Sequence, residues 1–194
     1  MKNFIFYKMS IILGNGKDGI VYTLLHRGRE YAVKQFKPQK SLNKIQLEAD
    51  LQAKAAKIGL SPKVKECNLD KKYIRMDKLD KSLYKLMKKK GGKLSIKHQK
   101  AIVEMANKLD KIGIFHNDPN IANFMLKDDK LYIIDYGFAK PINERLIKKY
   151  TKTPNKKYMI WGFLLKCRDE FGPDVKYTYL SKNLGSEIRK KFNF

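Results

Sequence analysis

The sequence has few acidic residues and very little arginine. Asp and Glu number 19 against 43 Lys and Arg, which gives a formal net charge of +24, and only six of the cationic residues are arginine. A charge of this size attracts phosphates and carboxylates, but proteins that read base sequence rely on the planar fork of arginine. The lysine excess therefore indicates either an acidic partner, such as nucleic acid or an acidic protein, or codon bias in an AT-rich genome.

Paired cysteines and long apolar runs are also missing. Cys67 and Cys167 are far apart in the sequence, which suggests neither a disulfide framework nor a zinc site, so we expect an intracellular protein, in the cytoplasm or in a host cytoplasm if it is a viral or secreted effector. No apolar run reaches the roughly 20 residues of a membrane span, so we expect none. Residues 1–13 superficially resemble a signal peptide, but Lys8 interrupts their apolar run and no cleavage site follows.

The apolar content, 43% of the residues, is sufficient for a core, and the first part of the chain predicts a β-sheet with one helix. Residues 42–58 contain no Gly or Pro and carry an apolar stripe at helical spacing. Ser41, directly before them, is a candidate N-cap. The stripe consists of Ile45, Leu51, Ala55 and Ile58. Alternating and β-branched residues predict strands over 10–13, 20–25, 30–36, 64–67 and 73–76.

Three glycines, Gly14, Gly16 and Gly19, join the first two predicted strands. Glycine at this spacing lets the backbone approach phosphates closely and present its N–H groups to them. Taken alone, the pattern is more often a tight turn. A second strand bearing Val21 follows it, however, where a dinucleotide-binding fold would need a helix.

Lys34 ends an apolar strand, and Glu48 follows it fourteen positions later inside the predicted helix. A buried ammonium is costly unless it is paired, so Lys34 is expected to meet nucleotide phosphates and a carboxylate, which Glu48 can supply by turning inward. The alternatives are a lysine that points outward from an edge strand and a glutamate that pairs along its own helix with Lys44 or Gln52.

The second half predicts helices that lead to a polar loop. Helical spacing indicates helices over 82–90, 96–112, 158–165 and 186–192. Two short apolar runs over 124–126 and 131–134 indicate a hairpin, and we expect a loop over 138–154. Between the second helix and the hairpin lie Asp118 and Asn123, and Asp135 follows the hairpin. Phosphoryl transfer needs one carboxylate near the attacking hydroxyl and oxygen ligands for Mg²⁺, and these residues fit both tasks. His116 is expected to be structural.

With these pieces in order, residues 10 to 165 resemble the protein-kinase-like superfamily. Gly14-x-Gly16-x-x-Gly19-x-Val21 is similar to its phosphate-covering loop, Ala32-Val33-Lys34 to its phosphate-contacting lysine and Glu48 to its helix glutamate. His116-Asn117-Asp118 with Asn123 is similar to its catalytic loop, and Asp135-Tyr136-Gly137 to its metal-binding D-F-G.

The resemblance implies an α+β, bilobal kinase-like fold, with a β-rich N-lobe over 1–78 and a reduced, mainly helical C-lobe over 79–194. It implies ATP with Mg²⁺, or Mn²⁺ in its place. Catalysis would rest on Asp118, Lys34 and Glu48, and the metal on Asn123 and Asp135. The nucleotide would contact the glycine loop, both strands beside it and the connector between the lobes: Gly14, Asn15, Gly16, Gly19, Val21, Ala32, Lys34, Met76, Asp77 and Leu79.

Several positions depart from the protein-kinase pattern. Asn117 replaces the arginine that reads a phosphorylated activation loop, and Asn120 replaces the lysine that meets the transferred phosphate. No A-P-E triplet follows Asp135, and Met159 stands where the family usually has an acid that supports the catalytic loop. The departures put the acceptor and the regulation in doubt, not the nucleotide chemistry.

Three functions follow. The first is an ATP- and Mg²⁺-dependent kinase that phosphorylates Ser or Thr of a protein. The second is the same chemistry on a sugar, a choline-like alcohol or a lipopolysaccharide core. The third is a kinase-shaped binding module, or a partner-activated effector, for tRNA, another nucleic acid or a ubiquitin-pathway protein. Polyanion binding that survives physiological salt would favour the third. The oligomeric state is unknown.

Overall fold

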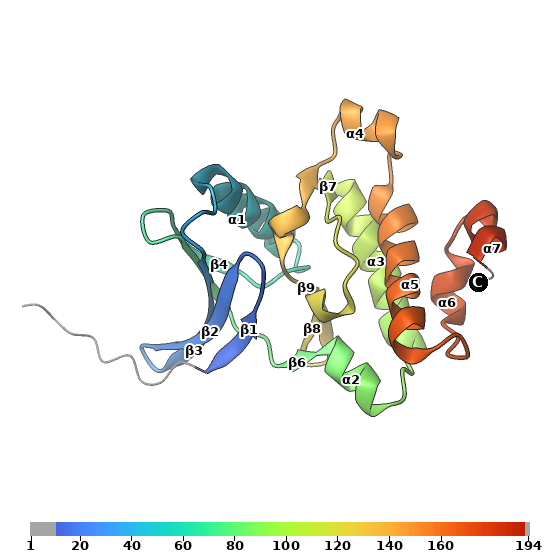
Figure 1. Cartoon of the computed structure of the whole chain (residues 1–194), viewed down its shortest axis with the longest axis horizontal. Helices are drawn as coiled ribbons and strands as arrows, with labels where there is room; N and C mark the ends of the chain where they lie inside the picture. The colour runs from blue at the N-terminus through green and yellow to red at the C-terminus, as the bar shows by residue number, and fades with distance from the viewer. Residues whose placement is uncertain (1–10, 193–194) are drawn as a thin grey trace, which may run out of the picture.

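The structure, a computed structural model, describes residues 11–192, and its architecture is α+β (Figure 1). An antiparallel five-stranded sheet in the order β1-β2-β3-β5-β4 lies at one end of the molecule. Its strands are β1 (Ile12–Asn15), β2 (Gly19–His26), β3 (Arg29–Phe36), β4 (Val64–Asn68) and β5 (Tyr73–Asp77). These match the strands predicted from the alternating pattern to within two residues at each described end.

Helix α1 (Leu42–Lys57) joins β3 to β4 and belongs to two hydrophobic clusters. Ile45 and Ala49 pack with the sheet residues, whereas Leu51 and Ala55 pack with the second, larger cluster that the later helices form. The loop after α1 is fixed to the same region, because the backbone N–H of Ile133 donates to the carbonyl of Leu60 at 2.9 Å. The sheet and the later part of the chain therefore share one helix.

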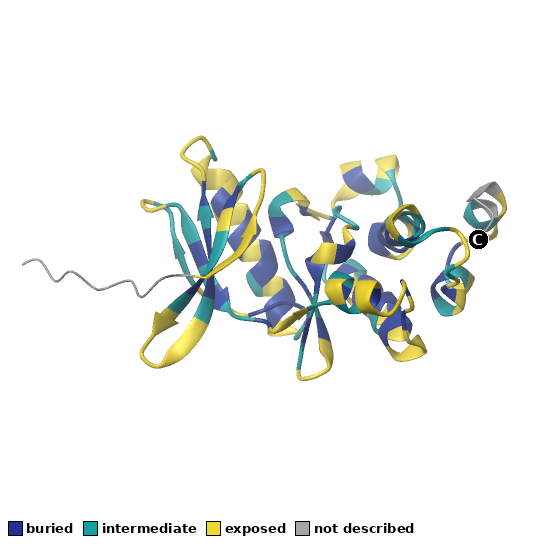
Figure 2. Ribbon diagram, turned by 60° about the horizontal axis from the view of Figure 1, so that its bottom comes forward, coloured by how far each residue is buried: buried dark blue, intermediate teal, exposed yellow. Residues whose placement is uncertain are grey.

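The rest of the chain is mainly helical, with short strands around one loop. Figure 1 shows α3 and α5 side by side, with α6 and α7 at the far end. The helices alternate between buried and exposed faces in Figure 2, as amphipathic helices do. The elements after β5 are β6 (Lys81–Ser82), α2 (Leu83–Lys89), α3 (Ile96–Lys111), β7 (Ile114–Phe115), η1 (Ile121–Asn123), β8 (Phe124–Lys127), β9 (Lys130–Ile133), η2 (Tyr136–Phe138), β10 (Lys140–Pro141), α4 (Glu144–Lys149), the π-helix η3 (Asn155–Met159), α5 (Ile160–Phe171), α6 (Thr178–Lys182) and α7 (Ser186–Phe192).

Several details differ from the sequence prediction. The predicted loop over 138–154 contains β10 and α4. Ser41 lies at the N-cap position of α1, but its side chain makes no capping hydrogen bond. Ile58 and Ile96, predicted to be on buried stripes, are 42% and 48% exposed because both lie at helix ends. Within residues 11–192, no helix has the length and apolar character that a membrane span requires. Residues 1–10, which include most of the apolar start of the chain, lie outside the described residues.

Candidate functional site

The Lys34 side chain connects three distant parts of the sequence. Its Nζ atom donates to Glu48 Oε1 on α1 at 2.5 Å and to Asp135 Oδ1, just after β9, at 2.7 Å. Lys34 is 8% exposed and Glu48 is 2% exposed. The inward pairing of Glu48 with Lys34 is thus present, and the alternatives of an outward lysine and of a glutamate paired along its helix with Lys44 or Gln52 are wrong.

The electrostatics of this trio keep Lys34 and Asp135 charged. Burial opposes the charge on Lys34, but Glu48 and Asp135 outweigh it and raise the pKa of the ammonium. Burial likewise opposes the charge on Asp135, yet Lys34 and the Gly137 N–H hold the pKa of its carboxyl below its usual value. Burial raises the pKa of Glu48, and Lys34 offsets this only in part. Glu48 Oε2 is buried without a hydrogen-bond partner.

The loop that carries Asp118 and Asn123 is held by its own hydrogen bonds. The half-buried Asp118 accepts from the backbone N–H of Asn120 at 3.2 Å through Oδ1, and Asn123, which is 7% exposed, donates through Nδ2 to the Asp118 carbonyl at 3.5 Å. The Asn123 carbonyl accepts from Ile134 N–H at 2.9 Å, which ties the loop to the residue before Asp135. One backbone hydrogen bond therefore links Asn123 to the neighbour of Asp135, and these are the two residues predicted to bind metal.

His116 is structural, as predicted. Its ring is completely buried, its Nε2 atom lies 3.1 Å from the Ile134 carbonyl, and it makes a T-shaped contact with the Tyr136 ring at a centroid distance of 4.8 Å. Burial lowers its pKa. The Tyr136 hydroxyl in turn shares a 2.5 Å hydrogen bond with the buried Ser61 at the end of the α1 loop. The D-Y-G segment is thereby packed from both sides.

The predicted glycine loop contains two kinds of glycine. A Cβ atom at Gly14 would have no heavy atom within 4 Å, and one at Gly16 would reach only the Gly19 carbonyl oxygen at 4.0 Å. At Gly19, by contrast, it would lie 2.0 Å from the Gln35 carbonyl oxygen on β3. Gly14 and Gly16 leave the loop open, whereas Gly19 is required by strand packing, a reason that the motif itself does not give.

The other predicted nucleotide contacts come from β2, β3, β5 and the connector. Val21 lies opposite Lys34, and Ala32 opposite Met76, so these side chains share one face of the sheet. Leu79 is buried. Asp77 differs, because its carboxylate accepts from Arg29 at 3.1 Å and its backbone N–H donates to the Lys63 carbonyl at 3.0 Å. Lys65 Nζ also lies 3.4 Å from the Asp77 carboxylate, so the Asp77 side chain is engaged within the sheet. Asn15 is exposed at the end of β1.

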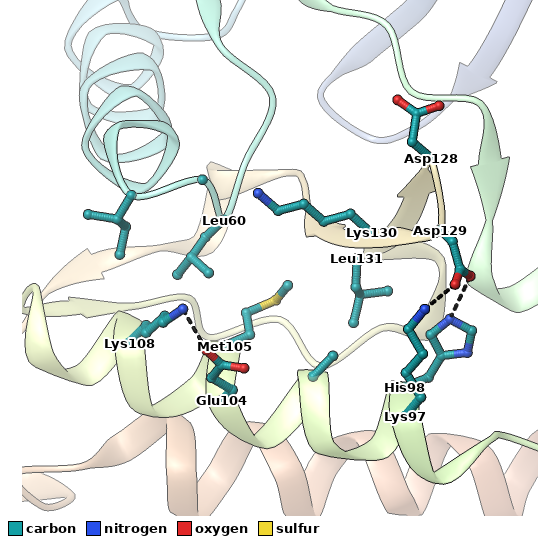
Figure 3. Close-up of a pocket in the computed structure, with 13 residues that line it drawn as sticks. Leu60, Lys97, His98, Glu104, Met105, Lys108, Asp128, Asp129, Lys130 and Leu131 are labelled. Carbon is teal, nitrogen blue, oxygen red and sulfur yellow. Dashed lines mark hydrogen bonds and ion pairs between the residues drawn. The ribbon is translucent and has the colours of Figure 1, made fainter.

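A cavity lined by described residues lies away from these side chains. It measures about 430 Å³ and lies between the end of α1, one face of α3 and the β8–β9 turn (Figure 3). None of the predicted site residues lines it. Two of its rim lysines are already paired with acids, Lys97 with Asp129 and Lys108 with Glu104. The side chains predicted to carry the chemistry lie outside it, so the candidate site is defined by the geometry around Lys34.

The sequence analysis missed two residues that support the loop carrying Asp118. Asn155, completely buried at the start of η3, accepts through Oδ1 from the backbone N–H of His116 at 3.0 Å, and it donates through Nδ2 to Asp110 of α3 at 2.7 Å. The missing acid at Met159 was the only signal in the sequence that another residue must take this role. Met159 itself is buried at 5% exposure in the larger core.

Two comparisons with known proteins bear on the site. The family model described as "ABC1 atypical kinase-like domain" matches residues 62–158, which is half of the chain and includes Asp118, Asn123 and Asp135. The glycine loop, Lys34 and Glu48 precede the matched stretch. A search of curated proteins found no match to this chain.

Proposed function

The chain belongs to the ABC1 atypical kinase-like family, and on this premise we propose that it is an ATP- and Mg²⁺-dependent phosphotransferase. The observation that carries the proposal is the Lys34 ammonium, which bonds to both Glu48 and Asp135 across 101 positions of sequence. A buried lysine held between two acids has the fixed position and full charge that binding of nucleotide phosphates requires.

The proposal includes two lobes, over 1–78 and 79–194, with the nucleotide between them. In its support, the sheet and the later helices have separate hydrophobic clusters, and the connector begins where β5 ends at Asp77. The open backbone at Gly14 and Gly16 would cover the phosphates. The faces of Val21, Ala32 and Met76, together with the buried Leu79, would contact the base.

The residues present fit a divalent metal held together with the nucleotide. Within residues 11–192, no group of three or more His, Cys, Asp or Glu side chains is placed to hold an ion by itself. Asn123 and Asp135 offer an amide oxygen and a charged carboxylate, which are ligands that Mg²⁺ and Mn²⁺ accept when phosphate oxygens complete the shell. When bound, the metal would neutralise phosphate charge.

In the proposed reaction, Asp118 orients the acceptor hydroxyl. The hydroxyl oxygen bonds to the γ-phosphorus, the bond from that phosphorus to the β–γ bridging oxygen breaks, and ADP departs with the electron pair. The hydroxyl proton passes to the Asp118 carboxylate. Lys34 binds the phosphates, and Glu48 holds Lys34 in place. The hydrogen bonds from Asn120 to Asp118 and from Asn123 to the Asp118 carbonyl fix the loop for this task.

For the acceptor, we propose Ser or Thr of a protein, because the glycine loop and Ala32-Val33-Lys34 follow the protein-kinase pattern. A small alcohol is the second candidate. Asn120 in place of the phosphate-meeting lysine favours it, as does membership of an atypical family whose members can act on other acceptors.

The direct test is transfer of label from γ-labelled ATP to a panel of proteins and small alcohols. We expect Mg²⁺-dependent transfer by the wild type and a fall of about 10²–10⁴-fold in Asp118→Asn, the usual range for loss of a general base. Asp70→Asn, which changes an exposed acid in the β4–β5 turn, is the matched control and should retain full activity. Near-wild-type transfer by Asp118→Asn would refute the assignment.

A further inference from the structure

Asn155 is a completely buried polar side chain, and two of its hydrogen bonds reach the residues that lead into the catalytic loop. Its Oδ1 accepts from His116 N–H at 3.0 Å, and its Nδ2 donates to the Ile114 carbonyl at 2.6 Å. The Asn155 side chain thus binds one backbone carbonyl of strand β7 and the backbone N–H of the first residue of the loop. Because buried polar groups are costly when unpaired, the loss of this amide would leave an orphan N–H and an orphan carbonyl directly before Asp118.

Asp110, at the end of α3, fixes Asn155 in turn. Its Oδ1 accepts from Asn155 Nδ2 at 2.7 Å and from the Asn155 backbone N–H at 2.9 Å, and its Oδ2 accepts from Lys156 N–H at 3.0 Å. The last two donors belong to the first turn of the η3–α5 helix, where N–H groups lack intrahelical partners and favour an anionic acceptor. Asp110 therefore caps a helix and orients Asn155 at the same time.

The same network continues to the metal-binding segment. His116 places Nε2 3.1 Å from the Ile134 carbonyl, directly before Asp135. A second contact from α5 acts on the loop, since a Cβ atom at Gly162 would lie 2.5 Å from Pro119 Cγ. The N-terminal end of the η3–α5 helix thus holds the backbone on both sides of Asp118, while Met159 contributes only apolar packing.

We propose that Asn155 and Asp110 are positioning residues that act as a pair to fix the backbone before Asp118, in place of the acid missing at position 159. The inference rests on the proposed phosphotransferase function. It extends that function, because Asn155, held in place by Asp110, would orient the catalytic carboxylate of Asp118. A misplacement of about 1 Å can cost about 10²-fold in rate, so the pair controls the chemical step and leaves nucleotide binding to Lys34 and the glycine loop.

The test compares Asn155→Ala and Asp110→Asn with Gln99→Ala. Gln99 is a suitable control because it lies on α3, as Asp110 does, and is 2% exposed. Its three hydrogen bonds go elsewhere, to Leu94, Tyr179 and Leu180. We expect both test variants to lower kcat by about 10- to 100-fold, with the KM for ATP within about twofold of wild type. Gln99→Ala should lose stability without a matching loss of kcat.

An exchange of the two side chains guards against simple misfolding. Asn155→Asp alone places two carboxylates against each other, which is unfavourable. Adding Asp110→Asn restores a donor between positions 110 and 155 and retains an acceptor for the His116 N–H, while the Ile114 carbonyl stays without the donor that Asn155 Nδ2 supplies. The double variant should therefore recover part, but not all, of the kcat that Asn155→Asp loses. Equal kcat in the single and double variants would overturn the pairing.

Hydrogen exchange separates this inference from the proposed function, since it needs no activity. The amides of residues 115–118 should exchange faster in Asn155→Ala and in Asp110→Asn than the loss of global stability accounts for, whereas in Gln99→Ala any change should match that loss. If the wild type transfers no phosphate yet exchange changes in this way, the phosphotransferase proposal fails and the positioning of the loop stands. Unchanged exchange at these amides would refute the positioning role.

Discussion

Among individual residues, Asp18 carries a negative charge in the glycine loop, and Lys40 forms an ion pair with it. Asp18 lies in the glycine loop between Gly16 and Gly19, where a carboxylate would repel phosphates. Lys40 Nζ donates to its Oδ2 at 2.6 Å, and this lysine side chain is only 11% exposed. A Cβ atom at Gly137 would lie 3.2 Å from the same oxygen, so the pair borders the D-Y-G segment. The loop can then cover phosphates despite its acid.

Lys40→Met should weaken MgATP binding by about tenfold, because it leaves Asp18 unpaired beside the phosphates. Isothermal titration calorimetry measures this, with the exposed Lys37→Met as the matched control. Combining Lys40→Met with Asp18→Asn should restore most of the affinity, since the repelling charge is then gone. A double variant as weak as Lys40→Met alone would contradict the role given to the pair.

His116 makes the stability of the protein depend on pH. Burial lowers its pKa below the ordinary value of about 6.5, so the folded state keeps the ring neutral while the unfolded chain takes up a proton. Its contribution is fully present above pH 6.5 and is lost as the pH falls towards the folded pKa. The slope of this loss is up to about 1.4 kcal/mol per pH unit.

His116→Gln should therefore be less stable at pH 7.5 but lose less stability than wild type between pH 6.5 and pH 5. Urea denaturation at several pH values gives both slopes. The other two histidines of the chain remain in both proteins and cancel in the comparison. Equal slopes for wild type and variant would show that His116 titrates normally in the fold.

The sequence was sufficient to predict the residues that carry charge in the site, but not those that hold them in place. Lys34, Glu48 and Asp135 stand in motifs whose spacing reflects their chemistry, and the structure brings them together. Asn155 stands in no motif, because its partner His116 lies 39 positions earlier and its role depends on how α3 and α5 pack. Lys40 was missed for the same reason, since its pairing with Asp18 exists only in the folded sheet.

At the scale of elements, the two ends of the glycine loop differ, because Gly19 begins strand β2 and packs against β3 whereas Gly14 has open surroundings. Gly19→Ala should destabilise the fold by about 1–3 kcal/mol, because the new methyl would overlap the backbone of Gln35. Gly14→Ala should change stability by less than about 0.5 kcal/mol, since its surroundings are open. Urea denaturation midpoints measure the difference. Equal losses for the two variants would show that the loop packs differently.

Long periodic elements were predictable, and short ones were not. The helices α1 and α3 each run for 16 residues with buried positions at helical spacing, and a clear pattern marks them. The short elements β10 and α4 depend instead on tertiary and capping bonds. Lys140 pairs with Phe115 of β7, and the Asn143 side chain accepts from Leu146 N–H at 3.0 Å. No periodicity develops over elements of two and six residues.

At the scale of the whole molecule, the net charge of +24 affects any study of nucleotide binding. Residues 81–100 contain eight lysines and no acidic residue, and all eight lysines are exposed. At low salt such a surface attracts any polyanion, ATP included, whereas physiological salt screens exposed charges beyond about 8 Å. A specific site must therefore be distinguished from general attraction by salt and by the choice of lysine.

The most direct test of the central claim is the affinity for MgATP at physiological salt, measured by calorimetry with circular dichroism as a check of folding. Wild type should bind with saturation, and Lys34→Met and Asp135→Asn should each weaken binding by about tenfold or more. Lys85→Met, which removes an exposed lysine of α2, should bind as wild type does. Folded Lys34→Met and Asp135→Asn that bind MgATP as tightly as Lys85→Met would contradict it.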